Sequence, residues 1–212
     1  MHIEKIELQN FRNYKNLELE FSKNVNLILG KNAQGKTNLL EAVYLTAIGR
    51  SFRTSKDLEL VKFNENNAIV KVWAEKELNS TTVEISIKRK GEKSSEKFIK
   101  KDRKNVTKTS QLLKNILIVI FSPEDLKIVK DEPEKRRKFI DRELSQISPK
   151  YYNSLSNYKK SLLQRNTYLK EDNLEPSIID LWDIQLAKYG AEVIFLRKEF
   201  IKKLSEYSAK IH

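Results

Sequence analysis

Eight consecutive residues near the N-terminus match a pattern that binds nucleotide phosphates. The stretch Gly30-Lys31-Asn32-Ala33-Gln34-Gly35-Lys36-Thr37 fits G-x-x-x-x-G-K-[ST] at every specified position. In this pattern the glycines let the backbone approach the phosphates, the lysine reaches the β- and γ-phosphates, and the threonine hydroxyl ligates Mg²⁺. We therefore expect residues 30–37 and the adjacent Asn38 to bind a nucleotide, with Thr37 as a ligand of Mg²⁺.

The flanks of this loop predict the strand and the helix that a phosphate loop needs. Upstream, residues 25–29 form a short apolar run typical of a buried strand. Downstream, apolar residues recur at helical spacing from Leu39 to Ile48, and Gly49 followed by Arg50 predicts the helix end. A helix N-terminus favours phosphate through its free N–H groups and its dipole. This context disfavours the alternative, a chance match in an ordinary turn.

Composition excludes several classes of site. The chain has 212 residues, enough for one core with an attached subdomain. It has no cysteine, so disulfides and thiolate metal sites are excluded, and its two histidines lie at opposite ends, which leaves zinc or Ser-His chemistry without support. No apolar run approaches the roughly 20 residues of a membrane span, and no signal peptide is visible. We expect a cytoplasmic protein without a membrane partner.

The net charge of +12 indicates a polyanionic partner, of which nucleic acid is the commonest. Between residues 88 and 104, nine basic residues face only three acidic ones, so half of the net charge lies there. The alternative is a lysine-rich surface, because lysines on edge strands also discourage aggregation.

The segment 50–54 offers a second candidate contact with phosphates or a DNA backbone. It combines two guanidinium groups with hydroxyls and an aromatic ring. The alternative is a solvated loop. Segment 50–54 and the basic segment 88–104 together supply the candidate DNA-binding residues: Arg50, Arg53, Lys88, Arg89, Lys90, Lys93, Lys100, Lys101, Arg103 and Lys104.

Alternating apolar and polar residues predict an antiparallel sheet. Strands are expected at 3–11 and 17–21 with a turn at 13–15, and at 68–74, 82–87 and 96–99 with a hairpin turn at 89–92. The most apolar run, 115–121, predicts a central buried strand. After it, Ser122 and Pro123 predict a helix start rather than the acidic strand end of a Walker B element. From Pro149 onward two helices are expected, separated near Glu175-Pro176.

Several of these segments resemble the RecF family. Residues 6–14 with the strand and loop that follow resemble the opening of ABC-type heads in SMC and RecF proteins, and the later segments are closer to RecF in particular. Asp131 departs from the resemblance, since the family usually has glycine there. The segments that carry the resemblance are 6–14, 30–42, 49–53, 121–130, 133–141, 158–166 and 181–187.

The resemblance implies an α/β fold: an ABC-ATPase-like head with a phosphate-loop strand–helix core and an antiparallel β-sheet subdomain, followed by a helical lobe. We expect an ATPase lobe at 1–147 and the helical lobe at 148–212. Arg12 would lie near the nucleotide phosphates or a partner subunit; the alternative is an exposed hairpin arginine. RecF proteins are longer, and the Walker B and ABC signature motifs would lie beyond residue 212, so we expect little or no ATP hydrolysis by this chain.

RecF-like proteins bind ATP and DNA, dimerise with ATP, and act with RecO and RecR to load RecA at single-strand gaps. The resemblance thus implies roles in DNA repair, replication and the SOS response, in the bacterial cytoplasm at the nucleoid. Two alternatives remain. An SMC-like structural head would need far longer heptad repeats than residues 150–212 offer. A phosphate-loop kinase or GTPase would not need the basic excess, and the guanine-reading N-K-x-D pattern is absent.

Overall fold

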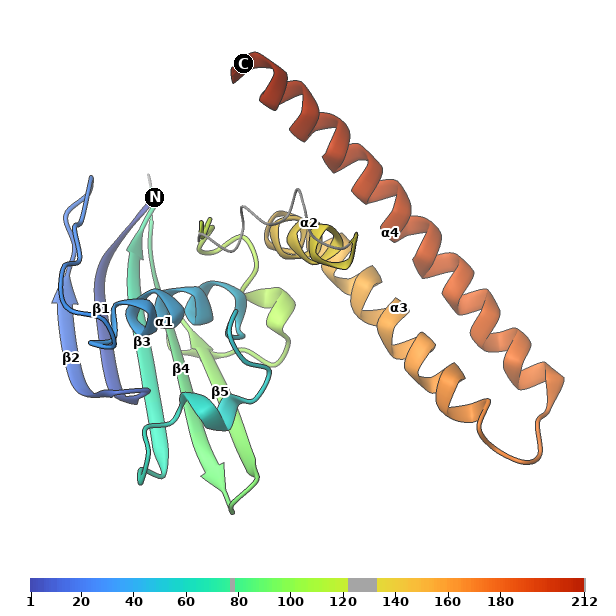
Figure 1. The fold of residues 1–212 in the computed structure, drawn as a ribbon, viewed down its shortest axis with the longest axis horizontal. Helices are drawn as coiled ribbons and strands as arrows, with labels where there is room; N and C mark the ends of the chain where they lie inside the picture. The colour runs from blue at the N-terminus through green and yellow to red at the C-terminus, as the bar shows by residue number, and fades with distance from the viewer. Residues whose placement is uncertain (77–78, 122–132, 212) are drawn as a thin grey trace. The chain divides into compact units, whose positions relative to one another are not determined.

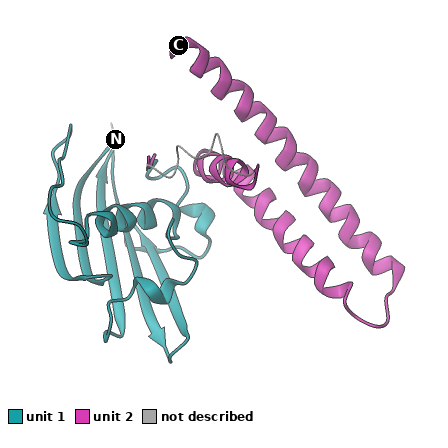
Figure 2. Cartoon of the chain, in the orientation of Figure 1, with its two compact units in different colours: residues 1–118 teal, residues 119–212 magenta. Residues whose placement is uncertain are grey.

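The computed structural model describes residues 1–76, 79–121 and 133–211. The chain forms two compact units, residues 1–118 and residues 119–212 (Figure 2). Each unit has its own core. The predicted boundary between an ATPase lobe at 1–147 and a helical lobe at 148–212 stays a prediction.

The first unit is built on a six-stranded sheet with the order β2-β1-β3-β4-β5-β6, in which every neighbouring pair is antiparallel (Figure 1). All five predicted strands of the sheet are confirmed, and they run longer than the alternation suggested. The strands are β1 His2–Phe11, β2 Tyr14–Glu20, β3 Asn67–Glu75, β4 Ser80–Lys90, β5 Ser94–Lys101 and β6 Lys104–Asn105.

Helix α1, Lys36–Ile48, lies across one face of this sheet (Figure 1). Alternate residues of the central strands point to that face, and Val70, Val72, Val83 and Ile85 are buried there. Burying apolar side chains of this size stabilises the fold by roughly 1.5–3 kcal/mol each. The helix ends as predicted at Gly49, whose left-handed φ of 78° lets its N–H reach the Leu45 carbonyl at 2.7 Å.

Two short 3₁₀ helices complete the described part of this unit. They are η1, Asp57–Leu60, and η2, Thr109–Gln111. Leu60, the last residue of η1, and Leu112, which follows η2, are both buried. The two 3₁₀ helices therefore contribute apolar side chains to the core of the first unit.

Two predicted strands are wrong. Residues 25–29 and 115–121 form no strand, and Leu27 and Val119 are 78% and 83% exposed. An apolar run favours burial, but a strand also needs a hydrogen-bonding neighbour, and no described strand pairs with either segment. Only the start of the second run, Asn115 and Ile116, is buried. The predicted helix start at Ser122-Pro123 lies outside the described residues. So does Asp131, the position at which the sequence differs from the RecF family.

The second unit consists of helices α2 Pro133–Ile147, α3 Pro149–Tyr168 and α4 Pro176–Ile211. The two helices predicted after Pro149 are confirmed. Ser148 caps α3 by accepting a hydrogen bond from the Tyr151 N–H at 3.2 Å. Leu144, Tyr151, Leu155 and Val193 form the core of the unit, so α2 packs together with α3 and α4. None of the described helices is long and apolar enough to cross a bilayer.

A charged cluster lies inside this helical core. Tyr151 is fully buried and its hydroxyl hydrogen-bonds the Asp141 carboxylate. Arg197 of α4 donates to the same hydroxyl at 2.8 Å and to Asp141 Oδ1 at 2.6 Å. Burial and the hydrogen bond to Asp141 raise the pKa of Tyr151. The cluster joins all three helices through one satisfied network.

Candidate nucleotide-binding site

The phosphate loop leads directly into the first turn of α1. Residues 30–34 are exposed, and Gly35 caps the helix with a left-handed φ of 104°. Among the described residues no side chain caps this end, and the first turn holds no acidic residue. Its backbone N–H groups are therefore available to an anion, which is the arrangement that phosphate-binding loops use.

Gly35 is tightly enclosed by the turn between β1 and β2. A Cβ atom at this position would lie 2.7 Å from Nδ2 of Asn13 and 2.9 Å from the hydroxyl oxygen of Tyr14. The amide of Asn13 donates to the Gln34 carbonyl at 3.2 Å, and its oxygen accepts from Asn38 at 2.8 Å. The β1–β2 turn therefore supports the loop, and any other residue at position 35 would have to displace Asn13 or Tyr14 on a backbone conformation that favours glycine.

The Lys36 side chain folds back over the loop. Its Nζ atom donates to the carbonyl oxygens of Gly30 at 2.6 Å and Lys31 at 2.8 Å. The ammonium group is thus held at the loop, where an incoming phosphate would meet it. Thr37 follows it and is exposed. The predicted roles of Lys36 and Thr37 stay predictions, and this geometry is compatible with both.

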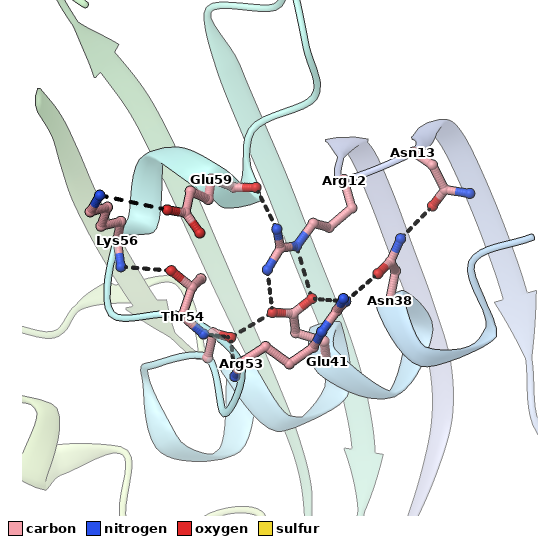
Figure 3. Close-up of polar contacts among 9 residues, drawn as sticks. Arg12, Asn13, Asn38, Glu41, Arg53, Thr54, Lys56 and Glu59 are labelled. Atoms are coloured by element: carbon pink, nitrogen blue, oxygen red, sulfur yellow. Dashed lines mark hydrogen bonds and ion pairs between the residues drawn. The ribbon is translucent and has the colours of Figure 1, made fainter. Parts of the chain in front are cut away.

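A buried carboxylate organises the residues beside the loop (Figure 3). Glu41 of α1 is fully buried and accepts from Nε of Arg12 at 2.9 Å and Nη2 at 2.7 Å. Ser51 donates to it at 2.5 Å, and Nη1 of Arg53 lies 3.3 Å away. The turn after β1, helix α1 and the loop that follows α1 therefore meet at one side chain.

The charge state of Glu41 follows from these partners. Burial alone raises the pKa of a carboxyl group, but hydrogen bonds from Arg12 and Ser51 and the charges of Arg12 and Arg53 outweigh it. The pKa of Glu41 is therefore lowered from its ordinary value of 4.5. Glu41 is ionised at neutral pH.

Backbone and ring contacts hold the two arginines in place. Arg12 has a left-handed φ of 53° and donates from Nη1 to the Glu59 carbonyl at 2.9 Å. Such a backbone is uncommon for a residue other than glycine. Next to Arg53, the ring of Phe52 packs edge-on against Tyr44 of α1, with 5.2 Å between centroids. The segment 50–54 is thereby attached to the helix that begins at the loop.

A cleft of about 560 Å³ opens beside these residues. Its polar lining includes the side chains of Arg12, Arg53 and Arg89, together with the amides of Asn13 and Asn38. Its apolar lining includes Val61 and Phe63, and Phe63 is 85% exposed. Mixed guanidinium, amide and aromatic groups beside a phosphate loop suit a ligand with both phosphates and a flat ring.

The predicted DNA-binding residues do not form one surface. Arg53 and Arg89 line the cleft, and Arg50 is exposed beyond the end of α1. The sheet register and the burial pattern place Lys88, Lys90 and Lys100 on the face of the sheet opposite α1. Lys101 lies on the other face, the one that α1 covers. Lys93, Arg103 and Lys104 lie in or beside the turns at either end of β5.

Several of these charges are already paired. Lys90 lies 2.6 Å from Glu96, Lys100 lies 3.6 Å from Glu84, and Lys97 lies 2.8 Å from Asp57. Within residues 1–76, 79–121 and 133–211, no ion pair joins an acidic group to Lys88, Lys93, Arg103 or Lys104. The basic segment thus contains lysines that form ion pairs with carboxylates and basic residues that form none among the described residues.

Sequence reasoning missed Glu41 and Asn13, and it assigned Ser51 to a candidate phosphate contact rather than to Glu41. Glu41 carried a signal, since it is an acidic residue within the otherwise apolar run of a helix expected to be buried. An isolated carboxylate there requires a cationic partner. Asn13 and Ser51 carried no comparable signal, because their partners belong to other segments of the chain.

Comparison with known proteins agrees with this architecture. A family model described as an AAA domain matches residues 5–212. The DNA replication and repair protein RecF of Clostridium tetani is 46% identical over 213 residues, and that of Clostridioides difficile is 44% identical over 212. Both alignments cover the whole chain. The chain spans 57% and 56% of the length of these two relatives.

Two solved structures are similar over 96% of the chain at 40% identity. They are described as the recombination mediator protein RecF with ATP and with ATPrS in the RecFOR pathway, and their TM-scores are 0.88 and 0.89. The chain covers 54% and 55% of those structures. The expected ABC-type ATPase head and the resemblance to RecF are confirmed. The chain belongs to the AAA domain family, and the relatives that it matches over its whole length are RecF proteins.

Proposed function

We propose that the chain binds ATP with Mg²⁺, and binds DNA, as the nucleotide-binding part of a DNA replication and repair protein of the RecF type. The observation that carries the proposal is the phosphate loop at the start of α1, where no side chain of the described residues caps the helix and Lys36 is held over the loop. A RecF protein solved with ATP has the same fold, which supports ATP as the nucleotide. Thr37, the first residue after Lys36, would bind Mg²⁺.

The cleft next to the loop supplies the rest of the nucleotide site in this proposal. Asn13 and Asn38 connect the cleft to the loop backbone, and the exposed ring of Phe63 offers a surface on which a base can stack. We expect binding with hydrolysis absent or trace, because the sequence has no apolar strand that ends in the acidic residues of a Walker B element.

The proposed role of the whole protein in the cell is inferred from its RecF relatives. We propose that the whole protein acts with RecO and RecR to load RecA at gaps, forms an ATP-dependent homodimer, and works at the nucleoid in the cytoplasm during repair, replication and the SOS response. The net charge of +12 supports a nucleic-acid partner.

Titration with a fluorescent ATP analogue in the presence of Mg²⁺ tests the nucleotide site. We expect Lys36→Ala to weaken binding at least tenfold, since it removes the charge nearest the phosphates, and Thr37→Ala to remove the dependence on Mg²⁺. Lys15→Ala, which removes an exposed lysine of β2, is the matched control. Equal affinities of the wild-type chain, Lys36→Ala and Lys15→Ala would contradict the proposal, and competition by GTP as strong as by ATP would contradict ATP as the ligand.

A further inference from the structure

Glu41 holds two guanidinium groups with a single negative charge. Its carboxylate is fully buried and accepts two hydrogen bonds from Arg12, one from Ser51 and a longer one from Arg53 (Figure 3). One buried carboxylate cannot neutralise two guanidinium groups. An excess positive charge therefore remains at this point, and it belongs to the arginine that is held less completely.

The two arginines differ in how they are held. The Arg12 side chain is 18% exposed, and three of its nitrogens donate to protein oxygens at 2.7 to 2.9 Å. The Arg53 side chain is 43% exposed, and its Nη1 atom is shared between Asn38 at 2.7 Å and Glu41 at 3.3 Å. Its Nε and Nη2 atoms have no hydrogen-bond partner in the part of the chain that the structure describes.

Arg53 is also closely connected to the phosphate loop. Its partner Asn38 directly follows Thr37, and Asn38 bonds to Asn13, which bonds to the Gln34 carbonyl. These contacts form a continuous line from the loop backbone to the guanidinium group. Arg53 lines the cleft, so its free N–H groups can reach a ligand there.

We propose that Glu41 is a positioning residue: its buried carboxylate locks Arg12 into the fold and holds Arg53 at the cleft, as the cation that contacts a nucleotide phosphate. The inference rests on the proposed nucleotide site and assigns Arg53 to it rather than to DNA. Arginine suits this role because its planar group can keep one nitrogen on Glu41 and Asn38 while the other two bind phosphate oxygens.

A double-mutant cycle on nucleotide affinity tests the proposal, with the fluorescent ATP analogue and Mg²⁺ as probe. We expect Arg53→Ala to weaken binding about tenfold, as the loss of a charge-assisted hydrogen bond does. Glu41→Gln should weaken it by several fold. If Glu41 acts through Arg53, the double variant will bind within about twofold of Arg53→Ala alone. Lys56→Ala, an exposed lysine near Arg53, should bind as the wild type does.

Two outcomes would overturn the proposal. Arg53→Ala could bind as tightly as the wild type, or the losses from Glu41→Gln and Arg53→Ala could multiply, which would mean that Glu41 acts independently of Arg53. Circular dichroism checks that each variant is folded, and if Glu41→Gln is not, Glu41→Asp takes its place in the cycle. Arg53→Lys, which keeps the charge without the planar group, should recover part of the affinity lost in Arg53→Ala.

The Lys36→Ala variant separates this inference from the proposed function. If the wild-type chain binds the analogue no better than Lys36→Ala, the nucleotide site itself is wrong. If binding depends on Lys36 but not on Arg53, only the role of Glu41 and Arg53 is wrong.

Discussion

The Nζ atom of Lys36 lies 2.6 Å from the carbonyl oxygen of Gly30, so the two ends of the phosphate loop are joined by a hydrogen bond. A second bond to the Lys31 carbonyl at 2.8 Å keeps the ammonium group over the loop. A phosphate oxygen carries more negative charge than a carbonyl oxygen and makes a stronger bond with an ammonium group. Nucleotide would therefore exchange these bonds for better ones without moving the lysine far.

Gly35→Ala should both destabilise the chain and abolish nucleotide binding. The added methyl group would lie 2.7 to 2.9 Å from Asn13 and Tyr14, on a backbone with φ of 104°. Gly91→Ala is the matched control, because its φ of 72° is also left-handed but its surroundings are open. We expect the control to cost about 1–2 kcal/mol and Gly35→Ala clearly more. Urea denaturation measures the free energy of unfolding of both variants. Equal decreases would show that Asn13 and Tyr14 move aside for the added methyl group at little cost.

Arg12→Ala should be among the most destabilising changes in the first unit. It leaves the buried Glu41 without its two shortest charged contacts, at 2.7 and 2.9 Å. Removing one partner of a buried ion pair costs about 3 kcal/mol or more. Arg53→Ala should cost less than about 1 kcal/mol, since that side chain is far more exposed. Thermal or urea unfolding compares the two, and a smaller loss for Arg12→Ala would contradict the assignment of Arg12 as the locked cation.

The pH dependence of stability should report the charge of Glu41. Its pKa is lowered in the folded chain, so its contribution to stability is present above the ordinary value of 4.5 and is lost as the pH falls below it. Glu41→Gln removes this contribution at neutral pH. The difference in urea midpoint between pH 7 and pH 4 should therefore be smaller in Glu41→Gln than in the wild type, while the exposed control Glu92→Gln should keep the wild-type difference.

Features that depend on neighbouring residues were predictable from the sequence. The phosphate-loop motif, helix α1 and the antiparallel strands were all specified by patterns within about ten residues. Glu41 was different, because its role depends on Arg12 and Ser51, which come from other segments. A pattern along the chain shows that a buried carboxylate needs a cation, but not which one.

The two wrong strands have a related cause. The apolar residues of 25–29 and 115–121 show that these segments favour burial, but the sequence does not show what they pair with. Pairing in a sheet is a relation between two segments. No described strand is hydrogen-bonded to either run, and Leu27 and Val119 are exposed although both are apolar.

The helical unit should depend on the charged cluster in its core. Asp141→Ala would leave the buried Tyr151 hydroxyl and the Arg197 guanidinium without their shared acceptor. We expect the helical unit to lose about 3 kcal/mol, and Tyr151→Phe to cost only about 1 kcal/mol because Arg197 keeps Asp141. Thermal unfolding followed by circular dichroism measures both. An Asp141→Ala variant as stable as Tyr151→Phe would show that the ion pair contributes little.

DNA binding should depend on the lysines of the basic segment that carry no ion pair. Lys88, Lys93 and Lys104 are exposed, whereas Lys90, Lys97 and Lys100 are already partnered by Glu96, Asp57 and Glu84. A phosphate gains more from a lysine that has no carboxylate to give up. Triple substitution of the first set by alanine should therefore weaken duplex binding more than triple substitution of the second, although both remove three positive charges.

Fluorescence anisotropy with labelled duplex DNA at several salt concentrations measures this difference. Each phosphate contact contributes about 0.9 to the slope of log affinity against log salt concentration. The first triple variant should lower the slope by up to about 2.7, and the second by much less. Equal losses in the two variants would mean that only the overall charge matters, and unchanged binding in both would place the DNA contacts outside residues 88–104.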